Sequence, residues 1–289
     1  MNDDSKDAPS DLASLEQKIR DLAKPRPLYT PKSVTPVYAL RYDWTGWPTE
    51  GTTLPPNTVD AIHACTEAWR GDGLFAGEYR ADRNRVQILF DATPTVSPVL
   101  CTARAKGRLQ HALRQAGTPV AFSRKVSFRS LGENIRAAVE GYLGKQARKE
   151  GFADPRFARR METFTVEDAA VDLSVPTETS TGRYWYNLHL VLVVGGRKKI
   201  ADNEMLGRIR DGVRRIARKK GYGLKSVSVM PDHVHMALRG TVEASPEEIA
   251  LGFLNNLAFL LGRNRVWQDG YYVGTFSEYG MDVIRRLAD

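Results

Sequence analysis

The chain repeats itself at a nearly constant distance, and this repetition restricts its fold more than any other feature of the sequence. In both copies a Ser-Pro pair has the serine suited to cap a helix and the proline suited to its first position. Three residue pairs lie 148 positions apart and a fourth lies 145 apart: Ser97 and Ser245, Arg85 and His233, Tyr38 and Tyr186, and Ser130 and Thr275. One offset shared by unlike motifs predicts an internal duplication.

Each copy predicts the same order of elements, strand-helix-strand-strand-helix-strand, followed by a terminal helix. In the first copy these are a strand at 37–47, a helix at 57–70, two strands within 74–90, a helix opened by Ser97, a strand at 125–131 and a helix at 133–151. In the second copy they are a strand at 185–195, a helix at 203–221, two strands within 223–238, a helix opened by Ser245, a strand at 271–276 and a helix at 277–289. This order is that of the ferredoxin-like fold, an antiparallel sheet with helices on one face.

The predicted fold class is therefore α+β, with two ferredoxin-like domains. Residues 36–151 form the first domain and residues 184–289 the second, joined by a connector at 152–183. Residues 1–35 are polar and contain several prolines, so we expect a mobile or lightly docked tail.

Composition restricts the partner and the compartment. The net charge is +8 and the isoelectric point is near 9.5, which favours a polyanionic partner, with nucleic acid the first candidate. The chain has only two cysteines, Cys65 and Cys101, too few for a disulfide framework. Its N-terminus does not resemble a signal peptide, and it has no apolar run long enough to span a membrane, so we expect a cytoplasmic protein with no membrane partner.

The stretch MPDHVHMAL, residues 230–238, places two histidines two positions apart. On a strand, His233 and His235 point to one face, while Val234, Met236 and Leu238 point to the other. The apolar set suits a helix-covered core, and two adjacent imidazoles suit a divalent metal ion. The simpler interpretation is a pair of surface histidines on a half-exposed strand.

In its context this motif resembles the single-tyrosine HUH transposases, the small enzymes of single-strand insertion sequences and their relatives of repetitive palindromes. The resemblance rests on MPDHVH after a strand, the following Ser-Pro helix, the run GYYVGTF, and the strand HLVLVVGGRKK that begins at His189. It covers residues 185–289 closely and the first half more distantly. It implies that His233 and His235 bind Mg²⁺ or Mn²⁺ at a phosphate of single-stranded DNA. A tyrosine on the final helix then attacks, giving a 5′-phosphotyrosine, and a polar residue one turn later, usually Gln, completes the metal site.

The sequence departs from this pattern in complementary ways. In the second half Leu287 occupies the position of the tyrosine, and no Gln follows it. In the first half Tyr142 and Gln146 are present in the expected register, but Arg85 and Gln87 stand in place of the two histidines. A site made of Arg85, Gln87 and Leu287 should therefore be catalytically inactive. In the family, dimers combine the histidines of one subunit with the tyrosine helix of the other. The resemblance therefore implies a fused pseudo-dimer with one composite site: catalytic Tyr142, with Gln146, His233 and His235 as metal ligands.

The predicted function is metal-dependent nicking and strand transfer of single-stranded or hairpin DNA, by a transposase or a domesticated derivative. The alternative is a DNA-binding protein that has lost its chemistry.

Tyr279 is a rival nucleophile, and Tyr271 and Tyr272 are predicted to support the sheet. His189 is either a structural histidine or a neighbour of the metal ligands. His63 and His111 have no predicted partner. Basic residues on two predicted helices could contact phosphates or simply face solvent: Arg214, Arg215, Arg218, Lys219, Lys220, Lys145, Arg148 and Lys149.

Overall fold

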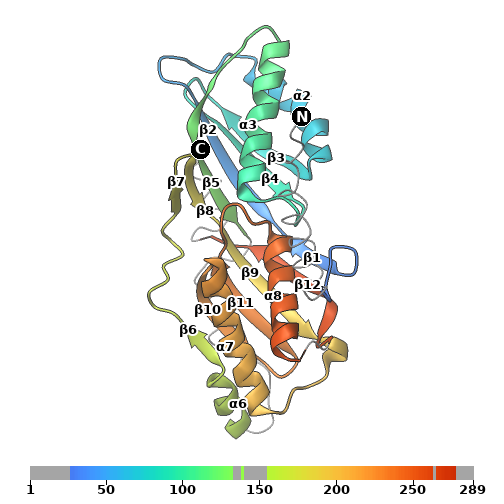
Figure 1. Cartoon of the computed structure of the whole chain (residues 1–289). Coiled ribbons are helices and arrows are strands. Elements are labelled where there is room, and N and C mark those ends of the chain that lie inside the picture. The colour runs from blue at the N-terminus through green and yellow to red at the C-terminus, as the bar shows by residue number, and fades with distance from the viewer. Residues whose placement is uncertain (1–26, 133–137, 140–154, 263–264, 278–289) are drawn as a thin grey trace, which may run out of the picture.

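Two six-stranded sheets form the protein, each with its helices on one face (Figure 1). The structure is a computed structural model that describes residues 27–132, 138–139, 155–262 and 265–277. The two sheets follow one another along the long axis of the molecule, and the helices of both lie on the same side in Figure 1. The α+β class predicted from the sequence agrees with this architecture.

The N-terminal sheet has the strand order β3-β4-β2-β5-β8-β7. Its strands are β3 (Leu74–Ala81), β4 (Val86–Ala92), β2 (Arg41–Pro48), β5 (Phe122–Leu131), β8 (Gly182–Trp185) and β7 (Thr177–Thr179). Two helices cover one face, α2 (Thr58–Gly71) and α3 (Pro98–Gln115).

The C-terminal sheet has the order β1-β12-β9-β11-β10-β6. Its strands are β1 (Thr35–Ala39), β12 (Trp267–Thr275), β9 (Asn187–Val194), β11 (His233–Arg239), β10 (Gly223–Val229) and β6 (Thr165–Glu167). Its covering helices are α7 (Asn203–Lys220) and α8 (Pro246–Leu260), with a short 3-10 turn η1 (Gly195–Arg197) after β9 and the helix α6 (Pro155–Glu162) before β6. We call the face of each sheet turned away from these helices the rear face.

The predicted Ser-Pro helix starts are confirmed in both halves. The Ser97 side chain accepts a hydrogen bond from the Leu100 N–H and Pro98 opens α3. Ser245 accepts from the Glu248 N–H, and the Glu248 carboxylate accepts from the Ser245 N–H, which completes a capping box. These caps satisfy backbone donors that have no partner within the helix, so they fix where each helix begins.

The four central strands have the same relative order in both sheets. Numbered along the chain within each half, the order is fourth, first, third, second: β5-β2-β4-β3 in one sheet and β12-β9-β11-β10 in the other. All of these neighbours are antiparallel.

The halves exchange a strand reciprocally at their junction. β1 runs directly into β2 with a bend at Leu40, yet β1 belongs to the C-terminal sheet, where it pairs parallel with β12. In the same way β8 runs into β9 with a bend at Tyr186, and pairs parallel with β5 of the N-terminal sheet. The single strand predicted at 37–47 is therefore wrong, because a bend divides it between two sheets. The strand predicted at 185–195 is confirmed as β9, except that Trp185 ends β8.

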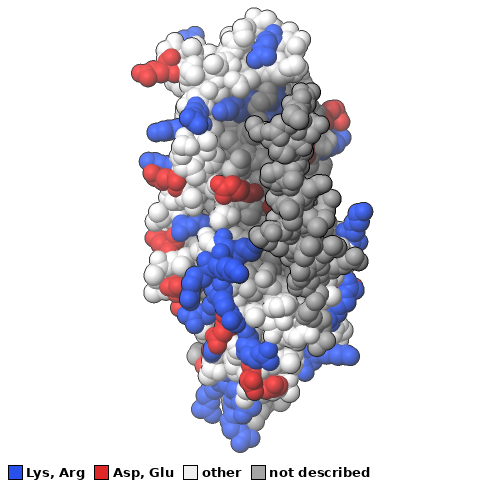
Figure 2. Space-filling view, viewed as in Figure 1, with Lys and Arg blue, Asp and Glu red and all other residues white. Residues whose placement is uncertain are grey.

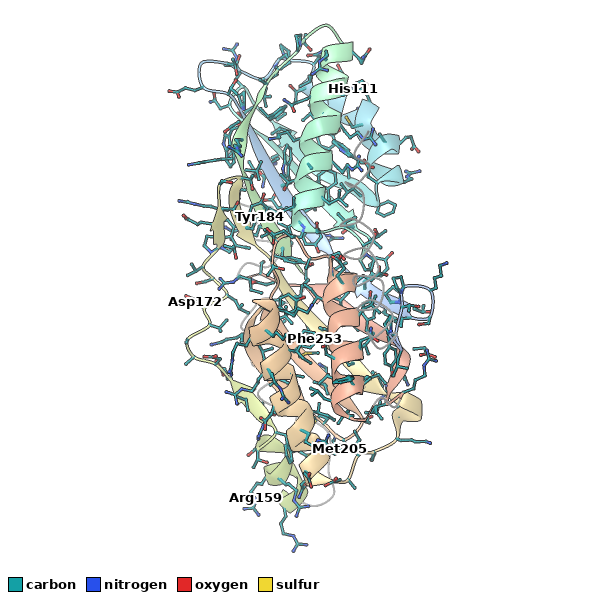
Figure 3. The ribbon with its side chains drawn as sticks, viewed as in Figure 1. His111, Arg159, Asp172, Tyr184, Met205 and Phe253 are labelled. Atoms are coloured by element: carbon teal, nitrogen blue, oxygen red, sulfur yellow. The ribbon has the colours of Figure 1, made fainter. Side chains whose placement is uncertain are left out.

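The exchange also corrects the offset of the first strands. The Leu40 carbonyl accepts from the Ala92 N–H, and the Tyr186 carbonyl accepts from the Gly240 N–H. Ala92 and Gly240 are 148 residues apart, but Leu40 and Tyr186 are 146 apart. The pairing of Tyr38 with Tyr186 in the sequence analysis was thus two residues out of register. Tyr38 corresponds to Tyr184, which lies at the junction in Figure 3, and the two pair with Val273 and Phe128 respectively.

Contacts between the halves come in matched pairs. The Arg41 N–H donates to Thr275 Oγ1 at 2.9 Å, and the Asn187 N–H donates to Ser130 Oγ at 3.0 Å. At the helix starts, the Val99 N–H donates to the Val242 carbonyl at 3.1 Å and the Glu247 N–H donates to the Pro94 carbonyl at 2.9 Å. Each bond has its partner at the equivalent positions of the other half.

The segment boundaries predicted from the sequence differ from the structure. The connector at 152–183 contains α6, β6, β7 and the start of β8, and its strands extend both sheets. The end of the predicted tail is also packed, because Tyr29 is buried and its hydroxyl donates to the Trp267 carbonyl. Neither segment has the apolar periodicity that marks core elements, so composition alone did not reveal them.

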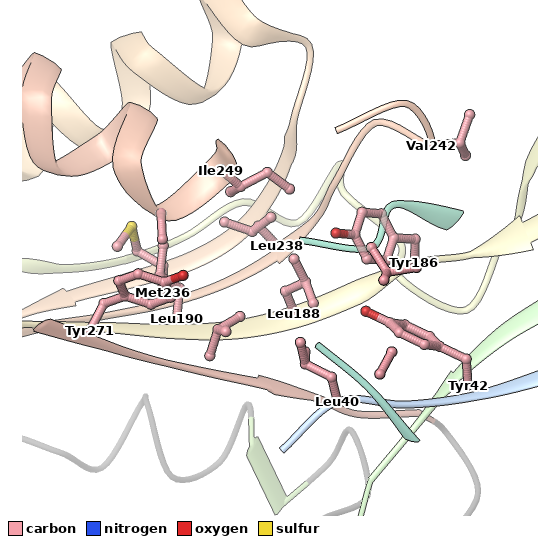
Figure 4. Close-up of a cluster of buried hydrophobic side chains, with 14 of the residues drawn as sticks. Leu40, Tyr42, Tyr186, Leu188, Leu190, Met236, Leu238, Val242, Ile249 and Tyr271 are labelled. Carbon is pink, nitrogen blue, oxygen red and sulfur yellow. The ribbon is translucent and has the colours of Figure 1, made fainter. Parts of the chain in front are cut away.

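One apolar core runs through the junction under α8 (Figure 4). Tyr42 of β2 and Tyr186 at the bend lie with ring centroids 6.3 Å apart, next to Leu188 and Leu238 of the other sheet. Phe253 of α8 covers the C-terminal sheet from the helix side (Figure 3). Among the described residues no helix has the length and apolar character needed to cross a lipid bilayer.

Candidate active site

The paired histidines lie on the central strand β11, on the rear face of the C-terminal sheet. Val234 and Met236 alternate with them and are buried in the core beneath the helices, as the sequence predicted. His233 and His235 are each 7% exposed, so they are not the surface histidines of the simpler interpretation. Their ring centroids lie 4.8 Å apart and the rings are nearly perpendicular.

A carboxylate orients the first histidine. His233 Nδ1 lies 2.7 Å from Asp232 Oδ1, and the guanidinium of Arg197 lies 3.5 Å from Asp232 Oδ2. A carboxylate accepts hydrogen bonds, so Nδ1 carries the proton and donates. The lone pair of His233 is then on Nε2, the tautomer that a carboxylate partner gives to a metal-ligating histidine.

A third histidine orients the second. His235 Nδ1 lies 3.0 Å from Nε2 of His189 on β9, and the two rings are stacked with centroids 5.2 Å apart. Burial lowers the pKa of His189 to about 4. Burial, with His189 and His233 close by, lowers the pKa of His235 to about 2. Both rings are therefore neutral at neutral pH, and Nδ1 of His235 is engaged by His189.

This arrangement fits a divalent metal ion, because two imidazoles on one strand each have Nδ1 engaged. No group of three or more His, Cys, Asp or Glu side chains in the described residues forms a metal site. Any further protein ligand must come from another residue type or from outside those residues. Tyr142, Gln146, Tyr279 and Leu287 all lie outside the described residues.

Two described residues, Ala138 and Val139, lie a few positions before Tyr142 in the chain. Ala138 and Val139 are helical, and Val139 is buried in a cluster with Leu173, Ala237 and Phe276. Ala237 is two residues beyond His235 on β11, so its side chain lies on the same rear face as the histidines. The first half therefore places Val139 against the C-terminal sheet, close to the strand that carries the histidine pair.

The other histidines and tyrosines lie away from this chemistry or support it. His63 of α2 contacts the Tyr79 hydroxyl of β3, and His111 lies on α3 at the far end of the molecule (Figure 3). Tyr271 is buried in the core, and Tyr272 packs edge-on against His189 at 5.8 Å. Both tyrosines are in β12, as the sequence predicted.

The equivalent position of the N-terminal sheet holds a different set. Gln87 on β4 occupies the place of His235, and its Nε2 donates to Oδ1 of Asp43 at 2.9 Å. Asp43 on β2 matches His189, so both sheets have a contact between the first and third strands. In one sheet it joins Asp43 to Gln87, and in the other it joins His189 to His235. Burial raises the pKa of Asp43 to about 6, an effect that Gln87, Arg129 and Arg85 reduce. Asp43 was not among the predicted site residues, although an offset of 146 for the first strand aligns it with His189.

Basic residues gather on the helix side of the C-terminal half. Figure 2 shows Lys and Arg side chains along α7 and around α6. The exposed cations of α7 are Arg208, Arg214, Arg215, Arg218, Lys219 and Lys220. The corresponding cations predicted near Tyr142, Lys145, Arg148 and Lys149, lie outside the described residues.

Known proteins resemble the second half in particular. Residues 183–287 match the family described as "Transposase IS200 like". The ISDra2 transposase TnpA of Deinococcus radiodurans is 30% identical over 119 residues, which cover 36% of this chain and 84% of that protein.

Two solved structures show weaker likeness. A putative transposase from Deinococcus radiodurans has 23% identity and a TM-score of 0.30, over 35% of this chain and 87% of that one. The regulatory subunit of aspartate kinase from Thermus thermophilus has 8% identity and a TM-score of 0.18, over 79% of this chain and 98% of that one. Neither adds to the assignment, which rests on the family match and on the relative that is 30% identical: the chain belongs to the IS200-like transposase family.

Proposed function

We propose that this protein cuts and rejoins single-stranded DNA through a covalent 5′-phosphotyrosine, as a transposase or a domesticated derivative of one. The observation that carries the proposal is the histidine pair of β11. Both imidazoles have Nδ1 engaged, by Asp232 and His189, and His235 is held in its neutral form. Nothing in a purely structural sheet requires two oriented, buried imidazoles side by side.

The proposed metal ligands are His233, His235 and Gln146, for Mg²⁺ or Mn²⁺. The bound ion would polarise the scissile phosphate and screen its charge as the nucleophile approaches. Asp232 and His189 would keep the two imidazoles in the required tautomers, and Arg197 would in turn hold Asp232.

The proposed nucleophile is Tyr142. Its hydroxyl oxygen attacks the phosphorus, the bond from phosphorus to the 3′-oxygen of the preceding nucleotide breaks, and that oxygen leaves as a free 3′-hydroxyl after taking up a proton. The tyrosine proton passes to solvent or to a nearby base. The product phosphodiester keeps the energy of the broken bond, so attack by a 3′-hydroxyl reverses the step and rejoins DNA.

The proposed site is composite, with the tyrosine from one half and the histidines from the other. Val139 supports this arrangement, because it is buried with Ala237 on the rear face of the C-terminal sheet. In the helix predicted at 133–151, Tyr142 and Gln146 are three and seven residues beyond Val139 and share its face.

The duplicated ferredoxin-like unit is part of the same proposal. The common strand order, the exchanged strands and the matched hydrogen bonds support two equivalent halves related by a pseudo-twofold axis. The chain then acts as a fused dimer with one site per chain, because Leu287 has no hydroxyl and the first half has no histidine pair.

The decisive experiment is peptide mapping of the covalent adduct formed with labelled single-stranded DNA and Mn²⁺. We expect one adduct per chain, on Tyr142. Tyr142→Phe should abolish it, and the matched control Tyr279→Phe should keep it. A label on Tyr279, or on two tyrosines of one chain, would contradict the composite site. Binding without any adduct under all metal conditions would favour the alternative of an inactive DNA-binding protein.

A further inference from the structure

A cavity on the rear face of the N-terminal sheet lies where the histidine site lies on the C-terminal sheet. It has a volume of ≈ 480 Å³, within the range of roughly 300–1,000 Å³ typical of small-ligand pockets. Its lining residues lie in or next to β2, β4, β5, β7 and β8 and include Trp47, Arg85, Gln87, Lys125, Arg183 and Trp185. Gln87 is the equivalent of His235, and Arg85 is the equivalent of His233.

The strand register places these side chains on one face. Thr45 of β2 is paired with Gln87 on one side and with Ser127 on the other, and Ser127 is paired with Arg183 of β8. Residues two positions away along each strand share that face, which brings in Trp47, Lys125 and Trp185. The cavity is therefore the rear-face surface of the sheet and not a gap between unrelated loops.

The charge of the cavity suits a phosphodiester. Arg85, Lys125 and Arg183 contribute three cations. Arg183 is paired with Glu178 of the lining at 3.1 Å, and Arg85 is paired with Asp82, outside the lining, at 3.3 Å. Both ion pairs are exposed and therefore weak. A guanidinium is charged at every relevant pH and screens a phosphate without a metal ion. The arginine at the position of His233 thus supplies permanently the positive charge for which the other half would need a bound ion.

The aromatic groups suit an unstacked base. The Trp47 side chain is 36% exposed, and Trp185 is held by a hydrogen bond from its Nε1 to the Ser174 carbonyl at 2.7 Å. The Arg129 guanidinium lies over the Trp185 ring, 4.1 Å from its centroid, so the ring is fixed in place. Cationic grooves with exposed aromatic side chains bind single strands, because the bases stack on the rings while the cations follow the backbone.

We propose that this cavity is a second DNA site, which binds a single-stranded segment without a metal ion and without cutting it. The identity of the ligand as DNA rests on the proposed function. The existence of a single-strand site there rests on the cations and tryptophans alone. The duplication would then have produced two sites of different kinds on one chain, one to cut a strand and one to hold a strand.

The test uses the intrinsic fluorescence of the full-length protein titrated with a short oligothymidylate in the presence of a chelator. The chain has five tryptophans, and Trp44, Trp69 and Trp267 are almost fully buried, so quenching reports on Trp47 and Trp185. We expect quenching without metal, reduced by Trp47→Phe and by Trp185→Phe. Arg85→Glu and Lys125→Glu should each weaken binding roughly 10-fold and make it less sensitive to salt. Arg114→Glu, on the last turn of α3, is the matched charge control and should change little.

The outcomes separate this proposal from the proposed function. His233→Ala with His235→Ala should keep the quenching, and Arg85→Glu should still form the tyrosine adduct at saturating DNA. No quenching by the oligonucleotide, or quenching unaffected by Arg85→Glu and Lys125→Glu, would overturn the second site whatever the adduct assay gives. If the unsubstituted protein forms no adduct but its fluorescence is quenched by the oligonucleotide, the proposed function is contradicted and the second site is supported as a binding site for single strands. Thermal melting of each variant checks that it is folded.

Discussion

The rear faces of the two sheets can be compared residue by residue, because the same strand order and register put equivalent positions side by side. Where the C-terminal sheet has His189, His233 and His235, the N-terminal sheet has Asp43, Arg85 and Gln87. The exchanged strands differ as well, since Arg183 and Trp185 of β8 correspond to Val37 and Ala39 of β1. One face has buried neutral imidazoles and the other has permanent cations and aromatic rings.

The comparison separates the core-facing side of each sheet, which folding restricts, from the rear face, which differs between the halves. The core-facing residues of β4 and β11 are apolar in both halves, Val86, Ile88 and Phe90 in one and Val234, Met236 and Leu238 in the other. The contact from the first strand to the third is kept, as Asp43 to Gln87 or as His189 to His235. The two sheets thus differ in chemistry on the rear face and agree on the face that packs against the helices.

The largest effect should come from removing the histidines. His233→Ala with His235→Ala should lower the yield of DNA adduct by roughly 10³-fold or more, because the phosphate charge is no longer screened by a metal ion. Arg85→Ala with Gln87→Ala is the matched change on the other face and should keep cleavage near its original rate at saturating DNA. Adduct formation is measured on denaturing gels with Mn²⁺ and with chelator. Equal losses of adduct yield from the two double variants would show that the two faces do not differ in function.

The exchanged strands should differ in their tolerance of substitution. Gly182 of β8 has φ +147°, and a Cβ there would lie 2.2 Å from the Val126 carbonyl oxygen. Gly182→Ala should therefore lower the free energy of unfolding by about 3 kcal/mol, through backbone strain and loss of close strand pairing. Pro36→Ala, at the equivalent position of β1, should cost less than about 1 kcal/mol. Urea unfolding measures both, and similar losses would show that the two exchanges are built alike.

The buried carboxylate of the N-terminal face should make stability depend on pH. The folded-state pKa of Asp43 is about 6, above its ordinary value of 3.8, so its stabilising contribution is complete below pH 3.8 and is lost as pH rises through 6. Asp43→Asn should therefore stabilise the protein at pH 7 by roughly 1–2 kcal/mol, and the gain should shrink as pH falls toward 4. Urea unfolding at several pH values measures this. A gain that does not change with pH would mean that packing, and not charge, is responsible.

The smallest effects concern the matched hydrogen bonds at the junction. Ser130→Ala leaves the buried N–H of Asn187 without its acceptor, and Thr275→Val removes the acceptor of the Arg41 N–H, which is only partly buried. We expect a loss of about 1–2 kcal/mol for the first and about 0.5–1 kcal/mol for the second. Chemical denaturation of the two variants gives both values. A larger loss for Thr275→Val would reverse the expected order and show that burial does not set the difference.

Much of the fold could be predicted from local signals in the sequence. The Ser-Pro caps located α3 and α8, and the alternation around His233 and His235 gave the two faces of β11 correctly. The strand exchange could not be predicted, because β1 and β8 are continuous in sequence with β2 and β9 and only long-range pairing tells which sheet each joins. The contact of His189 with His235 needed the register between β9 and β11, so the sequence left its role open. Asp232 directly precedes His233, but a carboxylate has no sequence signature of its own as an orienting partner.

The strand exchange also sets how the protein responds to concentration. In a dimer built from separate chains, a shared site dissociates on dilution, and its population depends on how much protein the cell makes. Here each half supplies a strand to the sheet of the other. A single residue, Leu40 or Tyr186, connects each exchanged strand to the next strand of its own half. Association of the halves is intramolecular, so its extent does not fall at low expression. A few copies per cell would therefore be as completely assembled as many.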